Sequence, residues 1–124
     1  MSPAIPAAAE APDVDRVFAA LADPTRRRLL QILAARRPLS ASALAGELPV
    51  TRQAVVQHLA VLQQSQLVVG RRAGREVLFS VRPEPLKATA SWMTTLADTW
   101  AERLQLLKEM AEQAEPAAAR PPAG

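Results

Sequence analysis

The chain has 124 residues and a net charge of +3, enough for one domain with a modest hydrophobic core. It has no cysteine, which excludes disulfides, thiolate metal sites and cysteine nucleophiles and fits a reducing compartment. Aromatic residues make up 3% of the chain, too few for the base-stacking platforms of proteins that bind single-stranded nucleic acid.

The two ends of the chain are rich in alanine and proline. Residues 1–12 are expected to form a disordered arm and residues 114–124 a disordered tail. The N-terminal segment lacks the basic and apolar regions of a secretory signal, and no run of about 18 apolar residues occurs. We therefore predict a folded domain over residues 13–113, in the cytoplasm.

The first two predicted helices carry apolar residues at helical spacing. The first spans about 13–21, and its apolar stripe consists of Val14, Val17, Phe18 and Leu21. Asp23 is a suitable N-cap and Pro24 suits a first helical position, so a second helix is expected over about 24–35. Its predicted buried residues are Leu29, Leu30, Ile32 and Leu33.

Two short helices joined by a tight break follow. Ser40 is expected to cap a helix over 41–48, and Thr51 one over about 52–64. The break between them is Pro49-Val50. The residues expected to point inward are Leu44, Leu48, Val55, Leu59 and Leu62. Two short helices joined in this way form the helix-turn-helix pattern.

The last part of the predicted domain combines a hairpin with a long helix. Residues 67–69 and 77–81 are β-prone, and residues 70–75 form the expected hairpin tip, where Gly74 can take a positive φ. A helix over about 86–113 has an apolar seam formed by Met93, Leu96, Trp100, Leu104, Leu107 and Ala111. This seam is too long for so small a core, so we expect it to face another subunit.

Three stretches carry a family resemblance. Residues 18–33 read FAALADPTRRRLLQIL, residues 50–62 read VTRQAVVQHLAVL and residues 69–75 read VGRRAGR. In this order they resemble the opening signature, the recognition helix and the wing of the ArsR (arsenic-repressor) family of bacterial regulators, over about residues 14–112. The resemblance implies a mainly α, winged helix-turn-helix fold of four helices, a small β-hairpin and a fifth helix. It also implies a homodimer through the first and last helices, and repression relieved by a signal.

The chain departs from the metal-sensing members of that family. Those sensors have a Cys-x-Cys pair on the helix before the turn, where this chain reads LAGEL over 44–48, or His and acidic ligands on the last helix, which here has no His. The sole histidine, His58, is on the recognition helix, and one His cannot build a zinc or nickel site in one subunit. We therefore expect no metal and no other cofactor.

Charge and helix position together predict a DNA-binding face. Residues 24–82 hold ten Arg and two Glu, a net of +8, between acidic ends, which favours a polyanion partner over an ordinary solvated surface. The outward positions near the start of the recognition helix are expected to read bases, and the wing arginines to meet phosphates or a minor groove. The predicted set is Thr51, Arg52, Gln53, Val56, Gln57, Arg71, Arg72 and Arg75. Val56 replaces a serine common in the family, so a thymine methyl is its expected contact.

Other candidate residues have two open interpretations. Arg26, Arg27 and Arg28 could contact phosphates or form a salt bridge to an acid such as Asp15. His58 could touch the DNA backbone or, as we favour, pack or hydrogen-bond at the helix edge. An apolar set is expected in a dimer core, with an effector pocket between subunits as the alternative. It consists of Val14, Val17, Phe18, Leu21, Trp92, Met93, Leu96, Trp100, Leu104 and Leu107.

These features together predict a sequence-specific regulator of double-stranded DNA. A homodimeric repressor on an inverted repeat would place two recognition helices in successive major grooves, roughly 34–36 Å apart. A winged helix used for protein contact is the rival, and it would bind DNA weakly and without salt dependence. An enzyme is disfavoured, because no Ser/His/Asp or Glu/His constellation lies near a glycine-rich loop. Besides DNA and a second copy of the chain, the sequence allows a small-molecule effector as a partner.

Overall fold

A computed structural model describes residues 13–119, with side chains described up to Ala114. The predicted disordered arm over 1–12 and the last part of the predicted tail, residues 120–124, lie outside the described residues. The chain divides into two units, the first ending at Thr89 and the second beginning at Ala90.

The first two helices begin behind aspartate caps. Helix α1 spans Val14–Leu21, and the Asp13 carboxylate accepts a hydrogen bond from the backbone N–H of Arg16 at 3.2 Å. Helix α2 spans Pro24–Ala35, and Asp23 accepts from the backbone N–H groups of Thr25 at 2.7 Å and Arg26 at 3.2 Å. Each cap satisfies N–H groups that the first helical turn leaves without partners. Both helices lie where the sequence predicts them.

The next two helices confirm the predicted helix-turn-helix. Helix α3 spans Ala41–Ala45, where Ser40 Oγ accepts from the N–H of Ala43 at 3.1 Å. Helix α4 spans Arg52–Gln64, where Thr51 Oγ1 accepts from the N–H of Ala54 at 3.0 Å. The predicted end of α3 at residue 48 is wrong by three residues. The helix ends before Gly46 because glycine loses more backbone entropy in a helix than other residues do.

The strands form a three-stranded antiparallel sheet in the order β1-β3-β2. Strand β2 spans Val68–Ala73 and β3 spans Glu76–Val81, so the hairpin tip is shorter than the predicted 70–75. Gly74 has a φ of +65° in that turn, as expected. Strand β1, Leu39–Ser40, was not predicted, because two residues carry no periodic pattern and only pairing with β3 defines them.

The hairpin packs closely on its own side chains at Gly70. A Cβ atom there would lie 2.9 Å from Val77 Cγ1, 3.1 Å from Phe79 Cε1 and 3.2 Å from Gln63 Nε2 of α4. Only glycine fits this approach without a shift of its neighbours. Gly70 therefore allows the hairpin to lie against the C-terminal part of α4.

The core of the first unit holds α4 in a defined orientation. Its buried apolar residues are Val17, Ala20, Leu29, Leu30, Ile32, Leu33, Ala41, Leu44, Val55, Leu59, Leu62, Leu67, Val68 and Phe79. Three of these, spaced at helical intervals, belong to α4, as predicted. Because one side of α4 is buried in this way, its opposite side faces outward.

Helix α5 spans Pro83–Ala119 and so is longer than the predicted 86–113. It begins at Pro83 because proline suits a first helical position. It continues beyond Gln113 to Ala119, with Pro116 in its last turns, so the predicted tail boundary at 114 needs correction. Every residue from 90 to 114 is exposed. No helix in the described part of the chain is long and apolar enough to span a membrane.

Candidate nucleic-acid interface

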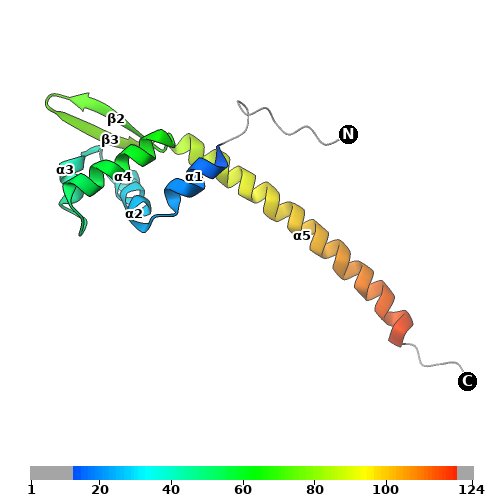
Figure 1. Cartoon of the computed structure of the whole chain (residues 1–124). Helices are drawn as coiled ribbons and strands as arrows, with labels where there is room; N and C mark the ends of the chain where they lie inside the picture. Colours follow the sequence, from blue (N-terminus) through cyan, green and yellow to red (C-terminus); the bar gives the residue numbers. More distant parts are fainter. Residues whose placement is uncertain (1–12, 120–124) are drawn as a thin grey trace, which may run out of the picture. The chain divides into compact units, whose positions relative to one another are not determined.

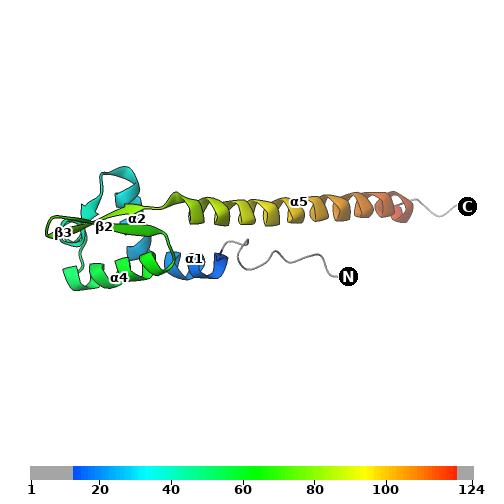
Figure 2. The same cartoon turned by 90° about the horizontal axis from the view of Figure 1, so that it is seen from above.

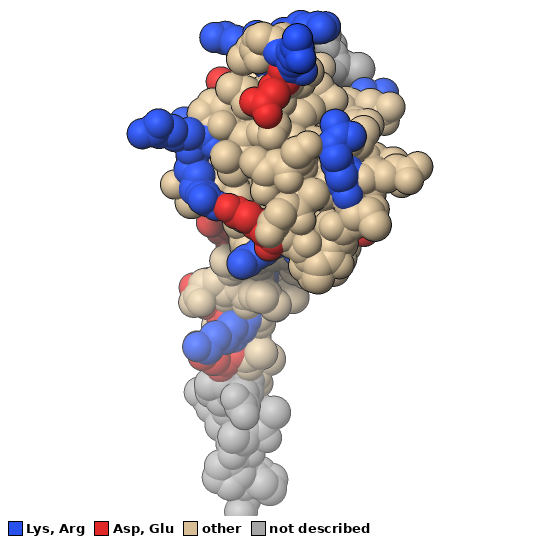
Figure 3. All heavy atoms as spheres, turned by 90° about the vertical axis from the view of Figure 1, so that its left-hand side faces the viewer, with Lys and Arg blue, Asp and Glu red and all other residues tan. Residues whose placement is uncertain are grey.

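The start of α4 and the hairpin tip lie at the same end of the first unit, as both Figure 1 and Figure 2 show. Figure 3 looks onto this end. Lys and Arg side chains stand at the top of the view, over the hairpin, and along both sides, with few acidic side chains between them. The predicted base-reading and backbone-reading elements are therefore brought together, with positive charge around them.

The outward face of α4 carries the predicted base-reading residues. Arg52, Gln53, Val56 and Gln57 are all exposed, whereas the helix is buried at Val55 and Leu59. Thr51 is exposed and serves as the N-cap. Donors and acceptors for base edges thus stand in the first two turns, the part of a recognition helix that enters a major groove.

Arg52 is held by a residue that the sequence analysis did not single out. Its Nε donates a hydrogen bond of 2.9 Å to Ser42 Oγ on α3. Both residues line an open groove of about 380 Å³ between α3, α4 and the sheet, together with Val56, Arg75 and Glu76. Ser42 lies only two positions after the capping Ser40, and no local pattern separates a partner of a distant arginine from an ordinary surface serine.

The three wing arginines do not share one face of the hairpin. Arg71 and Arg72 are neighbours on β2, paired with Leu78 and Val77 respectively, and successive strand residues point to opposite faces. Arg72 is therefore on the same face as Val77, which lines the groove beside Arg52. Arg75, in the turn, lines that groove as well. All three arginines are exposed. Arg72 and Arg75 are therefore on the face of the hairpin that borders the groove beside α4, and Arg71 is on the opposite face.

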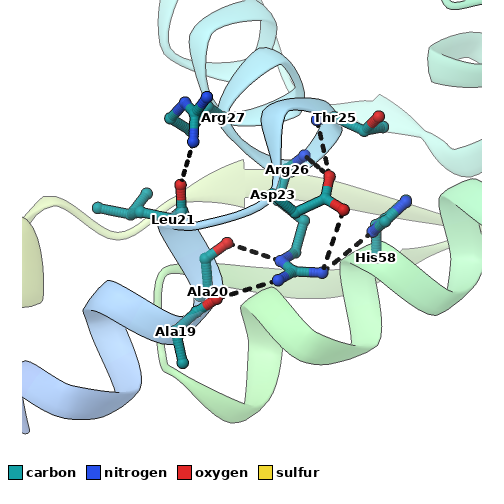
Figure 4. Close-up of polar contacts among 8 residues, drawn as sticks. All are labelled: Ala19, Ala20, Leu21, Asp23, Thr25, Arg26, Arg27 and His58. Carbon is teal, nitrogen blue, oxygen red and sulfur yellow. Dashed lines mark hydrogen bonds and ion pairs between the residues drawn. The ribbon is translucent and has the colours of Figure 1, made fainter.

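Arg26 joins α1, the α1–α2 turn and α4 in a polar cluster that Figure 4 shows. Its Nε donates to the carbonyl of Ala20 at 2.6 Å and its Nη2 to that of Ala19 at 3.0 Å. Its Nη1 lies 3.4 Å from His58 Nδ1 and 3.9 Å from Asp23 Oδ2. The guanidinium therefore donates to two of the last carbonyls of α1, of which that of Ala19 also accepts from the cap N–H of Ala22 at 3.4 Å.

The cluster bears on the two interpretations that were open for Arg26, Arg27 and His58. Arg27 Nη1 donates to the carbonyl of Leu21 at 2.5 Å. The side chains of Arg26 and Arg27 therefore both donate to carbonyls in the last turn of α1. Arg26 thus forms a structural ion pair, with Asp23 in place of the Asp15 given as an example, and a phosphate contact stays an open interpretation for the exposed Arg27. Arg28 is exposed, and its role stays open. His58 is half-buried beside Arg26, which agrees with the favoured hydrogen-bonding role at the helix edge.

The carboxyl group of Asp23 is the titrating member of this cluster. Burial raises its pKa, but hydrogen bonds from the backbone N–H groups of Arg26 and Thr25, and the positive charges of His58 and Arg26, lower it. The net result is a pKa below the ordinary value of 3.8. A carboxylate that is stabilised in the folded state favours folding wherever it is ionised.

Acid should remove this contribution of Asp23. Because the folded-state pKa is depressed, the stabilisation is complete at pH values above about 4 and is lost as the pH falls through the folded-state pKa. Asp23→Asn keeps an N-cap but not the charge. Its free energy of unfolding in urea should be below that of the parent at pH 6, and the difference should shrink towards pH 3. A difference that stays constant over this range would show that the charge contributes nothing.

The predicted interface residues are exposed except for Val14, Val17 and Leu21 on α1. Val17 is 2% exposed and packs in the core of its own chain, so its placement at a subunit interface is corrected. Val14 and Leu21 are half-buried, and Phe18 is 39% exposed. On α5, all the predicted interface residues are exposed, namely Trp92, Met93, Leu96, Trp100, Leu104 and Leu107. At 3.6 residues per turn these fall within about one third of the helix circumference, and we call them the α5 stripe.

Metal ligands do not gather in the part of the chain that the structure describes. Among those residues, no group of three His, Asp or Glu side chains is placed to hold a metal ion. The expectation that DNA binding is independent of zinc, nickel, copper and arsenite stays a prediction.

Comparison with known proteins identifies relatives of this arrangement. A family model described as "Helix-turn-helix domain" matches residues 21–71. The HTH-type transcriptional regulator Rv2034 of Mycobacterium tuberculosis is 46% identical over 74 residues, which cover 60% of this chain and 68% of that protein. The transcriptional repressor SdpR of Bacillus subtilis is 28% identical over 64% of this chain and 88% of its own length. Among solved structures, an ArsR-like transcriptional regulator from Rhodococcus sp. RHA1 is 39% identical, with a TM-score of 0.76 over 81% of this chain and 91% of that chain.

Proposed function

We propose that this chain, which belongs to the ArsR family of winged helix-turn-helix transcriptional regulators, acts as a homodimeric repressor on an inverted-repeat DNA operator. DNA-binding regulation of transcription is the activity of its relatives, and these are regulators rather than enzymes. The observation that carries the proposal is the exposed face of α4, with Arg52, Gln53 and Gln57, at the same end as the wing arginines.

The proposed division of labour follows from where the side chains stand. Arg52 and Gln53, in the first turn of α4, read base edges, since arginine pairs with guanine and glutamine with adenine in the major groove. Val56 contacts a thymine methyl, and Gln57 and the Thr51 cap complete the surface of this turn. Arg71, Arg72 and Arg75 neutralise phosphates beside that groove, which positions the protein without reading sequence.

Dimerisation is supported by the α5 stripe. A row of large apolar side chains on a helix with every residue exposed from 90 to 114 is costly for a monomer in water. A two-fold interface would bury the same stripe from both subunits and would fix the spacing of the two recognition helices. Phe18 and Val14 of α1 are the proposed additional contributors.

The regulatory signal is proposed only in outline. Loss of DNA binding requires an effector or partner with different affinities for the binding and non-binding forms of the dimer. With no cysteine and one histidine in the chain, we propose that the signal is not a transition metal. The proposed location is the bacterial cytoplasm, on the nucleoid through DNA binding.

Substitution of one base-reading and one backbone-reading arginine tests the proposal. The operator is first obtained by footprinting upstream of the protein's own gene or by selection from random duplexes. Arg52→Ala should then cost about 1–3 kcal/mol of binding free energy and reduce the preference at one base pair. Arg72→Ala should weaken binding to all duplexes alike and lower the slope of log affinity against log salt by roughly one.

Each variant is the control for the other. The two remove a single positive charge from the same face, so a purely electrostatic role would give equal salt slopes and equal changes in preference. That outcome would contradict the division of labour. Salt-independent binding, without preference for an inverted repeat, would contradict the proposed function as a whole.

A further inference from the structure

We infer that Ser42 of α3 is a positioning residue for Arg52 and thereby determines how strongly α4 discriminates between base pairs. The inference rests on the proposed base-reading role of Arg52 and adds a residue from outside the recognition helix. The observation behind it is the hydrogen bond of 2.9 Å from Arg52 Nε to Ser42 Oγ.

The hydrogen bond to Ser42 leaves the Nη groups of the Arg52 guanidinium available for a base. An arginine has five N–H donors in a planar fork, and only the one on Nε is taken by Ser42. The Nη donors keep the geometry that matches the O6 and N7 acceptors of guanine. Ser42 therefore fixes the plane of the fork without using the atoms that would meet the base.

The position of Ser42 is itself well determined. Helix α3 begins at the Ser40 cap, and Leu44 is fully buried in the core that also holds α4. The backbone carbonyl of Ser42 accepts from the N–H of Gly46 at 3.2 Å, and the turn after α3 is joined to the end of α2 by the Arg36–Glu47 ion pair. The hydroxyl that accepts from Arg52 thus stands on a helix joined to β3 at its start, through the pairing of Ser40 with Leu78, and to α2 after its end.

Stability does not explain the Ser42–Arg52 pair. Both residues are exposed, where a hydrogen bond contributes little net stability. Arg52 is the first residue of α4, beside the positive end of the helix dipole, which disfavours a cation there. The pair is instead suited to recognition, because a long side chain held in place before binding loses less conformational freedom on binding.

The surroundings leave room for a base edge. Arg52 and Ser42 face the open groove of about 380 Å³ that Val56 and Arg75 also line. The guanidinium is therefore fixed at one side by α3 and open at the other towards the proposed DNA surface. An arginine released from Ser42 would sample more of that open space and would discriminate less between bases.

The test uses five proteins and three duplexes. The proteins are the parent, Ser42→Ala, Ser42→Thr and Arg52→Ala, together with the double variant. The duplexes are the selected operator, the operator changed at the base pair whose preference Arg52→Ala removes, and a random sequence. Ser42→Ala should lower the preference of operator over changed operator about three- to tenfold, the range expected for freeing one immobilised side chain. Ser42→Thr, which keeps the hydroxyl, should retain it.

Further readouts separate positioning from other roles. Adding Ser42→Ala to Arg52→Ala should change nothing further, because the residue acts through the arginine. In the free protein, the NMR order parameter of Arg52 Nε–Hε should fall in Ser42→Ala, and the unfolding temperature should not. Affinity for the random duplex should be unchanged.

The outcomes distinguish this inference from the proposed function. If Arg52→Ala lowers base preference but Ser42→Ala does not, the Ser42 inference is wrong and the base-reading role of Arg52 stands. If Ser42→Ala weakens binding to all three duplexes equally, Ser42 is a backbone contact and not a positioning residue. If Arg52→Ala leaves the preference intact, both assignments fail, whether or not the protein still binds its operator.

Discussion

Replacing Leu104 with Glu should convert the protein to monomers and reduce its affinity for a full inverted repeat by more than about 100-fold, towards the value for a half-site. Leu104 is 58% exposed in the C-terminal half of the α5 stripe and far along the chain from every proposed DNA contact. In a two-fold interface the substitution acts twice. It removes two buried leucines, each contributing about 1.5–3 kcal/mol, and introduces two carboxylates that lose their water.

The loss of affinity would come from geometry, since no DNA-facing residue changes. A dimer binds its second half-site at a high effective concentration, and a monomer loses that advantage. The measurement is sedimentation of the variant combined with titration of full and half operators. If Leu104→Glu sediments as a dimer and binds the full operator with parent affinity, the interface lies elsewhere and the role proposed for the α5 stripe is wrong.

Gln105→Glu is the control for this experiment. It introduces the same negative charge one residue further along the chain, and at 3.6 residues per turn it lies on the opposite side of α5 from the stripe. Gln105 is exposed and donates only an exposed hydrogen bond of 3.2 Å to Glu109. This variant should remain dimeric and bind the full operator as the parent does. Dissociation of both variants would indicate a general effect of charge on the helix.

Replacing Arg26 with Ala should lower the free energy of unfolding by about 2–4 kcal/mol, since hydrogen bonds from a charged group contribute about 1.5–3 kcal/mol each. The Arg26 side chain is 17% exposed and donates to two carbonyls at the end of α1. Alanine would leave both carbonyls without this partner and would remove the cation that lies between Asp23 and His58. The measurement is urea unfolding at pH 7 with a constant slope against denaturant.

Two further variants define the cause of the Arg26 effect. Arg26→Lys keeps the charge but not the fork, so it should recover only part of the lost stability. Arg27→Ala removes an exposed arginine that donates to the single carbonyl of Leu21, and its cost should be clearly smaller. Equal losses for Arg26→Ala and Arg27→Ala would contradict the account, because the fork and its burial would then have no particular importance.

The sequence alone predicted the features that depend on capping residues and on the spacing of apolar residues along a helix. Asp23, Ser40 and Thr51 cap helices where a short polar side chain precedes an apolar pattern, because the first N–H groups of a helix need acceptors. The spacing of Val55, Leu59 and Leu62 determined the buried side of α4, and hence the exposed side with Arg52 and Gln53. These features depend on residues within one or two helical turns of each other, so the local sequence is sufficient to predict them.

The tertiary structure decided which residues meet across the chain. Arg26 reaches His58, 32 positions away, and Arg52 reaches Ser42, 10 positions away, through hydrogen bonds for which the sequence carries no periodic signal. Strand β1 exists only through its pairing with β3, and Val17 belongs to the core because α1 turns that side of its apolar stripe inward. In each case the partner is brought close by packing of the core, which places distant segments together, whereas composition and spacing describe only neighbours along the chain.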